Sequence, residues 1–366
     1  MPKPRNKENK GLPLRWRRIR DVYYYDVPQG LEPQWENKKL FRLGRTIQEA
    51  SQVWIQRKTL NQESDEIRTI GQLLDRYALE VIPTKSKSSQ ASNHNQLPMV
   101  RGVFGEMLLT SFKPQLVYKY VENRSRKITD PSTGKVKGGK IAAHREIELL
   151  SHAFTKAVEW GVIDRHPFKG QVRLSGERPR NRYVEDWEIN EALSLKSNRS
   201  SGSVVMIQAY IRLKLLTGMS QGDLLRLQET QLKEDGIHNQ RHKTSNTTGK
   251  RTIYQWTPEL REVVSQVKRS RPAKFTPFMF CNRNGAGYID EQTGTASGWK
   301  SMWQRFMDRL ISETSIKERF TEHDLRAKVA SDASSVEHAR ALLAHSDSRT
   351  TDRIYRRKAE IVIPLR

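Results

Sequence analysis

The spacing of the apolar residues changes after Gly44, and this change limits what the chain can fold into. Residues 12–43 carry the β-branched and aromatic side chains typical of strands, first in LRWRRIRDVYYYDVP and then in KKLFRL. From Ile47 onward, apolar residues recur every three or four positions, as they do on the buried face of a helix. Residues 12–60 are therefore predicted to form a three-stranded sheet with one helix.

Helical patterns continue through residues 68–170. Helices are predicted over residues 69–82, within residues 105–127 and, most clearly, over residues 142–163. The third helix carries an apolar stripe that indicates a face buried in the core, made of Ile147, Leu150, Phe154, Val158 and Val162. The segment TDPSTGKVKGGK before it is predicted to be a turn or a small hairpin.

Proline, glycine and basic residues mark where one domain ends and the next begins. Pro167 prevents the helical segment from continuing, and a basic connector that contains Pro and Gly follows. A second, mostly helical domain begins at Val184 and includes a β segment near Gly236 and Gly249. We therefore predict a multidomain chain, mainly α with small β elements. Its parts are a sheet-and-helix domain at 1–66, a helical domain at 67–170, a linker at 171–183 and an α+β domain at 184–366.

The charge of the chain points to a polyanionic partner. Lys and Arg number 65 against 41 Asp and Glu, a formal net charge of +24, which an ordinary metabolic enzyme seldom carries. Nucleic acid is the simplest partner, and an anionic membrane surface is the main rival. No run of 18 apolar residues and no secretory signal is present, so we expect neither a membrane span nor secretion. The single cysteine, Cys281, excludes an internal disulfide and fits a reducing cytoplasm.

Basic residues gather at three places that suit contact with a phosphate backbone. The candidates are Arg15, Arg17, Arg18 and Arg20 around Trp16, Lys140 and Arg145 at the start of the third predicted helix, and Arg178, Arg180 and Arg182 in the linker. Arg15 and Arg17 are expected on one face of a strand, because side chains alternate along it. Each group also fits an ordinary solvated surface or linker.

Four segments of the last domain carry the residues of a chemical site, in a fixed order. They are LLTGMSQGDLLRL at 215–227, HKTSNTTGKRTIY at 242–254, TEHDLRAKVASD at 321–332 and LLAHSDSRTTDRIYRRK at 342–358. The ordered set resembles the catalytic domain of the tyrosine recombinases, the phage integrase (lambda-integrase-like) family. The most specific matches are HDLR at 323–326 and the block that ends at Tyr355.

The resemblance implies a role for each of these residues. Tyr355 would be the nucleophile that forms a 3′-phosphotyrosine, which conserves the bond energy without a metal or another cofactor. Arg326 would clamp the phosphate, His323 would transfer a proton and His345 would donate to the phosphate. Lys243 would be the general acid, although Lys250 lies on the same segment. Asp324 is expected to support the site or the start of its helix rather than react.

Two departures from the family pattern affect this assignment. Ser220 stands where the family normally has its first arginine, in the segment TGMSQGDL. Loss of one of two charged clamps predicts a slower reaction. Three interpretations follow: an engineered, deliberately slowed enzyme, a natural variant that uses another cation such as Lys243 or Lys250, and a homologue that only binds DNA. The spacing from His345 to Tyr355 is also one residue longer than is commonest in the family.

The resemblance extends to the whole chain, since such integrases carry a β-sheet domain for arm-type DNA sites and a helical (SAM-like) core-binding domain. It implies a phage integrase in a bacterial cytoplasm, at the nucleoid, that forms a homotetramer on double-stranded att DNA with core and arm-type sites. A host DNA-bending protein and an excisionase are candidate further partners. The tail at 359–366, with Ile361, Val362 and Ile363, is expected to pack on a neighbouring protomer. The alternatives are a type IB topoisomerase-like enzyme and a DNA-binding regulator or architectural protein.

Overall fold

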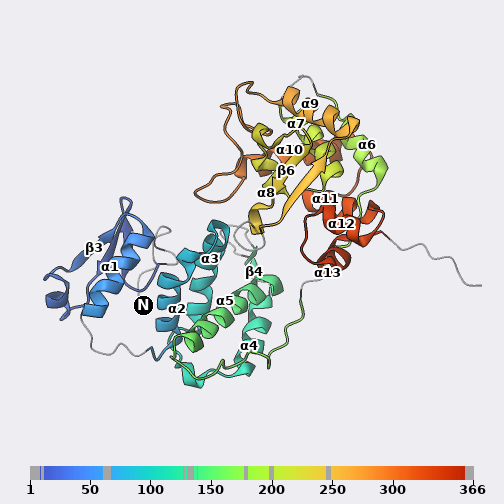
Figure 1. Cartoon of the computed structure of the whole chain (residues 1–366). Coiled ribbons are helices and arrows are strands. Elements are labelled where there is room, and N and C mark those ends of the chain that lie inside the picture. Colours follow the sequence, from blue (N-terminus) through green and yellow to red (C-terminus); the bar gives the residue numbers. More distant parts are fainter. Residues whose placement is uncertain are drawn as a thin grey trace, which may run out of the picture. The chain divides into compact units, whose positions relative to one another are not determined.

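The computed structural model describes residue 9 and residues 12–60, 67–126, 128–129, 136–137, 139–176, 180–197, 202–244 and 249–358. The chain divides into two compact units, Met1–Glu177 and Arg178–Arg366, both drawn in Figure 1. The division lies within residues 171–183, the segment predicted as a linker. Each unit has hydrophobic clusters of its own. The predicted multidomain fold, mainly α with small β elements, is confirmed.

The first unit begins with the predicted three-stranded antiparallel sheet and helix. Strands β1 (Trp16–Ile19), β2 (Val22–Asp26) and β3 (Leu40–Gly44) lie in sequence order, and helix α1 (Ile47–Leu60) packs on β3 and β2. Arg20 and Asp21 have φ of 45° and 61°, which suits the two-residue turn between β1 and β2. Tyr25 lies opposite both Trp16 and Phe41, and its ring meets Trp54 at 4.3 Å. These aromatic rings form the core of the sheet.

One inference about this sheet is corrected by the backbone. Strand β1 begins at Trp16, and Arg15 before it has φ of 64°. The alternation of side chains along a strand therefore does not place Arg15 on the face of Arg17.

A bundle of four helices completes the first unit (Figure 1). The helices are α2 (Ile70–Glu80), α3 (Lys87–Phe104), α4 (Pro114–Ser125) and α5 (Lys140–Glu159). The three predicted helices are α2, α4 and α5, and the predicted hairpin before α5 is the pair β4 (Ile128–Thr129) and β5 (Val136–Lys137). Ile147, Leu150 and Phe154 of the predicted stripe are buried in the core. The sequence analysis missed α3, which has only three buried apolar residues, Leu97, Val100 and Phe104.

The second unit is built around helix α7 (Ser203–Thr217). Most of its side chains are buried, and it packs against α9 (Pro258–Ser270), α10 (Ser297–Glu313) and α11 (Glu322–Asp332). Tyr210 of α7 meets Trp299 and Phe280 in this core, at 4.7 and 5.3 Å between ring centroids. The remaining helices are α6 (Asp186–Ser194), α8 (Gln221–Arg226), α12 (Val336–Leu342) and α13 (Ser348–Thr350).

The predicted β segment is an antiparallel hairpin of β6 (Gly236–Gln240) and β7 (Arg251–Gln255). The first residue of the hairpin, Gly236, has to be a glycine, because a Cβ there would lie 2.3 Å from the carbonyl oxygen of Tyr254. Tyr254 is buried, and its hydroxyl donates to the carbonyl of Leu342 at 2.9 Å. This bond ties the hairpin to the C-terminal helices, where the predicted site residues lie.

Candidate active site

Helix α11 carries two of the predicted site residues at its first turn. Thr321 caps the helix, because its hydroxyl accepts from the backbone N–H of Asp324 at 3.2 Å while the Asp324 carboxylate accepts from the N–H of Thr321 at 2.8 Å. Glu322 accepts from Gln221 of α8 at 2.6 Å and from Trp299 of α10 at 3.0 Å. The start of α11 is therefore fixed to two other helices, and His323 and Arg326 are fixed with it.

Tyr355 lies at the end of a π-helical turn, η7 (Thr351–Tyr355), which follows α13. Its ring centroid is 4.9 Å from those of both His323 and His345. The guanidinium carbon of Arg326 lies 5.6 Å from the centre of the same ring. The structure thus brings together four of the residues that the sequence analysis assigned to the site.

Arg326 is buried and rigidly oriented. It donates to the backbone carbonyl of Gly218, to that of Leu343 at 2.5 Å and to Nε2 of His345 at 3.1 Å. Burial lowers the pKa of Arg326, and its interaction with Tyr355 opposes that effect. A guanidinium has five N–H donors and stays charged in proteins, so at most two donors remain for a phosphate.

His345 is arranged as a neutral imidazole. Its Nε2 faces Nη2 of Arg326, and its Nδ1 lies 2.8 Å from the hydroxyl of Thr351. Burial, followed by the charges of Arg326 and Arg241, lowers the pKa of His345 to about 3. Because an arginine only donates, Nε2 is the acceptor and the proton is on Nδ1. In this arrangement His345 orients Arg326, and a donor role toward phosphate would require a further proton on Nε2.

His323 has a different environment. The residue is exposed, although its ring packs on Tyr355. Partial burial and the nearby charge of Arg357 lower its pKa. A neutral imidazole whose ring packs on a tyrosine is a candidate acceptor for the tyrosine proton, and the role of His323 stays a prediction.

Asp324 anchors the segment of the chain that follows Tyr355. Its carboxylate is fully buried and pairs with Arg357, two residues after the tyrosine, at 2.5 Å. Arg357 also donates to the carbonyl of Arg182 at 2.7 Å, and its N–H donates to Ser331 at 2.8 Å. The predicted supporting role of Asp324 has a specific partner in Arg357, which the sequence analysis did not identify.

Ser220 is the N-cap of helix α8 and provides no charge to the site. Its hydroxyl donates to the Asp223 carboxylate at 2.7 Å and accepts from the Asp223 N–H at 3.2 Å. The other carboxylate oxygen of Asp223 accepts from the N–H of His242 at 3.0 Å. Asp223 therefore connects position 220 to the end of strand β6.

The two candidate lysines occupy different positions. Lys243 lies in the short helix η6 (His242–Thr244) and is exposed, and in the described part of the chain no contact joins it to Tyr355, Arg326 or either histidine. Lys250 donates to the backbone carbonyl of His345 at 2.7 Å. Burial, then the charges of Arg340 and Arg241, lower the pKa of Lys250. The described geometry brings Lys250 to the cluster, whereas the general-acid role of Lys243 stays a prediction.

The basic residues predicted to contact DNA in the first unit are exposed. Arg17 pairs with Asp26, and Arg18 pairs with Asp21 at 2.6 Å, on the sheet. The other exposed cations of this set are Arg15, Arg20, Lys140 and Arg145, and Arg145 pairs with Glu148 at 3.1 Å. Their contact with DNA stays a prediction.

The linker arginines have partners within the second unit. Arg180 pairs with Asp324 at 3.1 Å, and the half-buried Arg182 pairs with Glu188 and, at 3.3 Å, with Glu318. These contacts give both residues a structural role that the sequence analysis did not expect. Arg178 and the tail at 359–366 lie outside the described residues.

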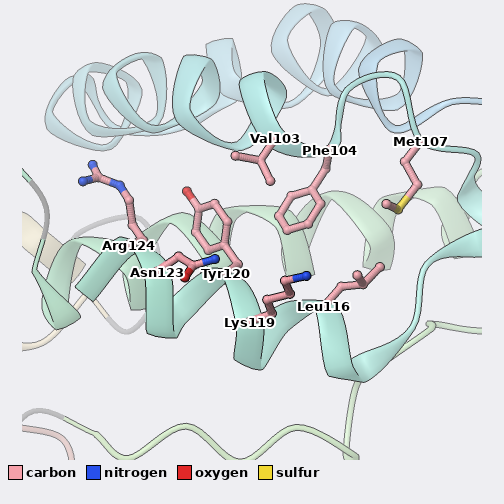
Figure 2. Close-up of a pocket in the computed structure, with 8 residues that line it drawn as sticks. All are labelled: Val103, Phe104, Met107, Leu116, Lys119, Tyr120, Asn123 and Arg124. Atoms are coloured by element: carbon pink, nitrogen blue, oxygen red, sulfur yellow. The ribbon is translucent and has the colours of Figure 1, made fainter. Parts of the chain in front are cut away.

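A separate pocket of about 410 Å³ lies between α3 and α4 in the first unit, away from the predicted site residues in sequence. It is lined by Val103, Phe104, Met107, Leu116, Lys119, Tyr120, Asn123 and Arg124. Figure 2 shows Arg124 and Asn123 at one end of it and Met107 and Leu116 at the other. Tyr120 and Arg124 donate to the buried carboxylate of Glu146, at 2.6 and 2.8 Å, which makes this end part of the packing of the bundle.

No group of three or more His, Cys, Asp or Glu side chains in the described ranges is placed to hold a metal ion. Among the same residues, none of the helices combines the length and the apolar character that crossing a bilayer requires.

Solved structures of integrases share this fold over most of the chain. A lambda integrase dimer bound to a COC′ core site matches with a TM-score of 0.58 and 16% identity, covering 99% of this chain and 100% of that chain. A lambda integrase tetramer bound to a Holliday junction matches at 0.58 and 18% identity, with 99% and 100% covered. The Tn1549 transposon integrase in complex with circular intermediate DNA matches at 0.58 and 14% identity, with 81% and 96% covered. The sequence matches no protein-family model and no curated protein.

Proposed function

We propose that this chain, which has the tyrosine-recombinase fold, is a site-specific DNA recombinase. The observation that carries the proposal is the cluster of His323, His345 and Arg326 around the ring of Tyr355. A tyrosine hydroxyl with a neutral imidazole and a fixed guanidinium beside it has the parts needed to attack a phosphodiester.

The reaction is a phosphoryl transfer, in which one phosphate ester bond replaces another. The Tyr355 oxygen bonds to the scissile phosphorus as the bond to the 5′ oxygen breaks, and the product is a 3′-phosphotyrosine with a free 5′-hydroxyl. The neutral imidazole of His323 accepts the tyrosine proton, and Arg326 stabilises the charge that gathers on the non-bridging oxygens. A lysine of the hairpin protonates the 5′ oxygen, with Lys243 and Lys250 as the two candidates.

The full reaction joins two duplexes. Four protomers would bring two att sites together, cut one strand of each, form a Holliday junction and then exchange the second pair of strands. The N-terminal sheet would bind arm-type sites, and the helical bundle with the last domain would bind the core site. This proposal agrees with the lambda integrase tetramer on a Holliday junction, whose fold the chain shares.

A suicide substrate tests the first step. A core-type duplex with a nick next to the cleavage position loses the short 5′-hydroxyl strand after cleavage and so traps the covalent adduct. We expect a denaturation-resistant protein–DNA adduct from the wild type and none from Tyr355→Phe, which keeps the ring but removes the nucleophile.

The suicide substrate, together with plasmid-relaxation and recombination assays, separates the alternatives. A protein that only binds DNA shifts the duplex in a gel but gives no Tyr355-dependent adduct, even as Ser220→Arg. A topoisomerase-like enzyme relaxes supercoiled plasmid as a monomer and yields no recombinant product from two att duplexes. Either result would contradict the recombinase proposal.

A further inference from the structure

Arg241, between strand β6 and helix η6, is held in place by backbone bonds on both sides. Its own N–H donates to the carbonyl of Lys250 at 3.4 Å, across the hairpin. The next N–H, that of His242, donates to the carboxylate of Asp223 at 3.0 Å. Asp223 also bonds to Ser220. The backbone that carries Arg241 is therefore linked through Asp223 to Ser220, the position that lacks the expected charge.

Arg241 belongs to a cluster of cations around His345. Lys250 and Arg340 both donate to the carbonyl of His345, at 2.7 and 3.4 Å, and Arg326 donates to its ring at 3.1 Å. After burial, the charge of Arg241 contributes to lowering the pKa of His345, of Lys250 and of Arg326. Arg241 therefore lies within electrostatic reach of His345, Lys250 and Arg326.

The four cations of the cluster outnumber the acidic side chain beside Arg241, the buried carboxylate of Asp223. None of Arg241, Arg326, Lys250 and Arg340 forms an ion pair with a described carboxylate, and the nearby Asp223 is bonded to Ser220 and His242. Like charges gathered without acidic partners repel each other, and a bound anion relieves that repulsion. The cluster surrounds His345, whose ring contacts Tyr355, so the anion would lie where the scissile phosphate must be.

The hydrogen-bond donors lead to the same conclusion. Nε of Arg241 is buried and has no hydrogen-bond partner among the described residues. A buried donor without a partner is unfavourable, and an anion oxygen would satisfy it. Arg326 has at most two donors left for a phosphate, fewer than the non-bridging oxygens of a phosphodiester can accept.

We propose that Arg241 binds the scissile phosphate together with Arg326. Arg241 would thus supply the second guanidinium of the site, which Ser220 cannot supply from the position of the expected arginine. The inference rests on the proposed recombinase function and assigns the substrate contact to a residue outside the four matching segments. It also predicts that positions 220 and 241 can replace each other as the source of this charge.

A reciprocal rescue tests the inference with the suicide substrate. We expect Arg241→Ala to slow adduct formation by about a hundredfold, the effect of removing one donor from an oxyanion site. Ser220→Arg added to Arg241→Ala should restore the rate at least tenfold over that of Arg241→Ala alone. Arg251→Ala, an exposed cation of the same hairpin, is the matched control and should change little.

Folding is controlled with a second variant and a second measurement. Arg241→Gln keeps the stem of the side chain without its charge, and it should show the same loss of rate while its thermal midpoint stays within a few degrees of the wild type. Gel-shift affinity for the same duplex separates slower chemistry from weaker binding.

Each remaining outcome decides against the inference. Rates for Arg241→Ala and Arg241→Gln within threefold of the wild type would overturn it while leaving the recombinase proposal intact. A loss that Ser220→Arg does not rescue would assign Arg241 a structural role in the hairpin instead. If the wild type itself forms no Tyr355-dependent adduct, both proposals fail together.

Discussion

At the residue scale, three of the residues predicted from the motifs, His323, Arg326 and His345, lie around Tyr355, whereas no described contact brings Lys243 there. They could be predicted because the ordered segments resemble the tyrosine recombinase pattern, in which these residue types serve phosphoryl transfer. Arg241 and Arg357 could not, since nothing local in the sequence marks them. Their importance comes from contacts over long sequence separations, Arg357 with Asp324 and Arg241 with the environment of His345. The sequence analysis identified Ser220 as a missing charge, and the structure adds that it caps helix α8.

His345 gives a prediction about stability and pH. Its pKa falls from 6.5 to about 3 in the folded chain, first because of burial and then because of Arg326 and Arg241. The unfolded state therefore takes up a proton near pH 6.5, while the folded state does so only near pH 3. The stabilisation from this group is complete above pH 6.5 and is lost as pH falls toward 3, at up to about 1.4 kcal/mol per pH unit.

The measurement is the free energy of unfolding from urea titrations between pH 6 and pH 4. We expect His345→Asn to lose stability with a shallower slope than the wild type over this range. His338→Asn, at an exposed position, should keep the wild-type slope. Equal slopes in all three proteins would contradict the neutral state of His345.

At the scale of elements, patterns with many apolar residues predicted structure well, and polar ones did not. Strands β1 to β3 were predicted from their β-branched and aromatic residues, and helix α5 from its regular apolar stripe. Helix α3 was missed, since Ala91 is the only apolar residue among its first ten and Pro98 lies inside it. Its helical state depends on the Ser86 cap, which accepts from Ser89 at 3.4 Å, and on packing against α2 and α5.

The turn that carries Tyr355 depends on an anchor after it, which gives a prediction at this scale. Arg357→Ala leaves the fully buried Asp324 carboxylate with Arg180 as its remaining described ion-pair partner. We expect a loss of about 3 kcal/mol in the free energy of unfolding, since the buried Asp324 carboxylate loses one of its two described ion-pair partners. Adduct formation should also slow, because the backbone after Tyr355 is no longer fixed.

Arg356→Ala provides the matched control, because Arg356 is exposed and stands between Tyr355 and Arg357 in the sequence. Denaturant unfolding and the suicide-substrate rate measure the two effects in the same variants. Similar losses for Arg356→Ala and Arg357→Ala would rule out the Asp324 pair as the anchor.

At the scale of the whole molecule, the net charge of +24 does not act as one uniform field. Many of its cations are paired within the protein, as Arg182 is with Glu188 and Glu318. The cations around His345 instead lack acidic partners among the described residues, as do Arg15 and Arg20 on the N-terminal sheet. Cations without such partners are the ones able to exchange counterions with DNA.

The last prediction separates paired from unpaired cations on the sheet by their effect on salt dependence. The logarithm of the DNA affinity should fall linearly with the logarithm of salt concentration, by about 0.9 per phosphate contacted. The double variant Arg15→Ala/Arg20→Ala should reduce this slope by about 1.8, since each arginine would release counterions from one phosphate. Arg17→Ala/Arg18→Ala should reduce it less, because Asp26 and Asp21 already pair with those side chains. Affinity is measured by fluorescence anisotropy with one duplex at several salt concentrations, and an unchanged slope in the first variant would place DNA contact elsewhere on this unit.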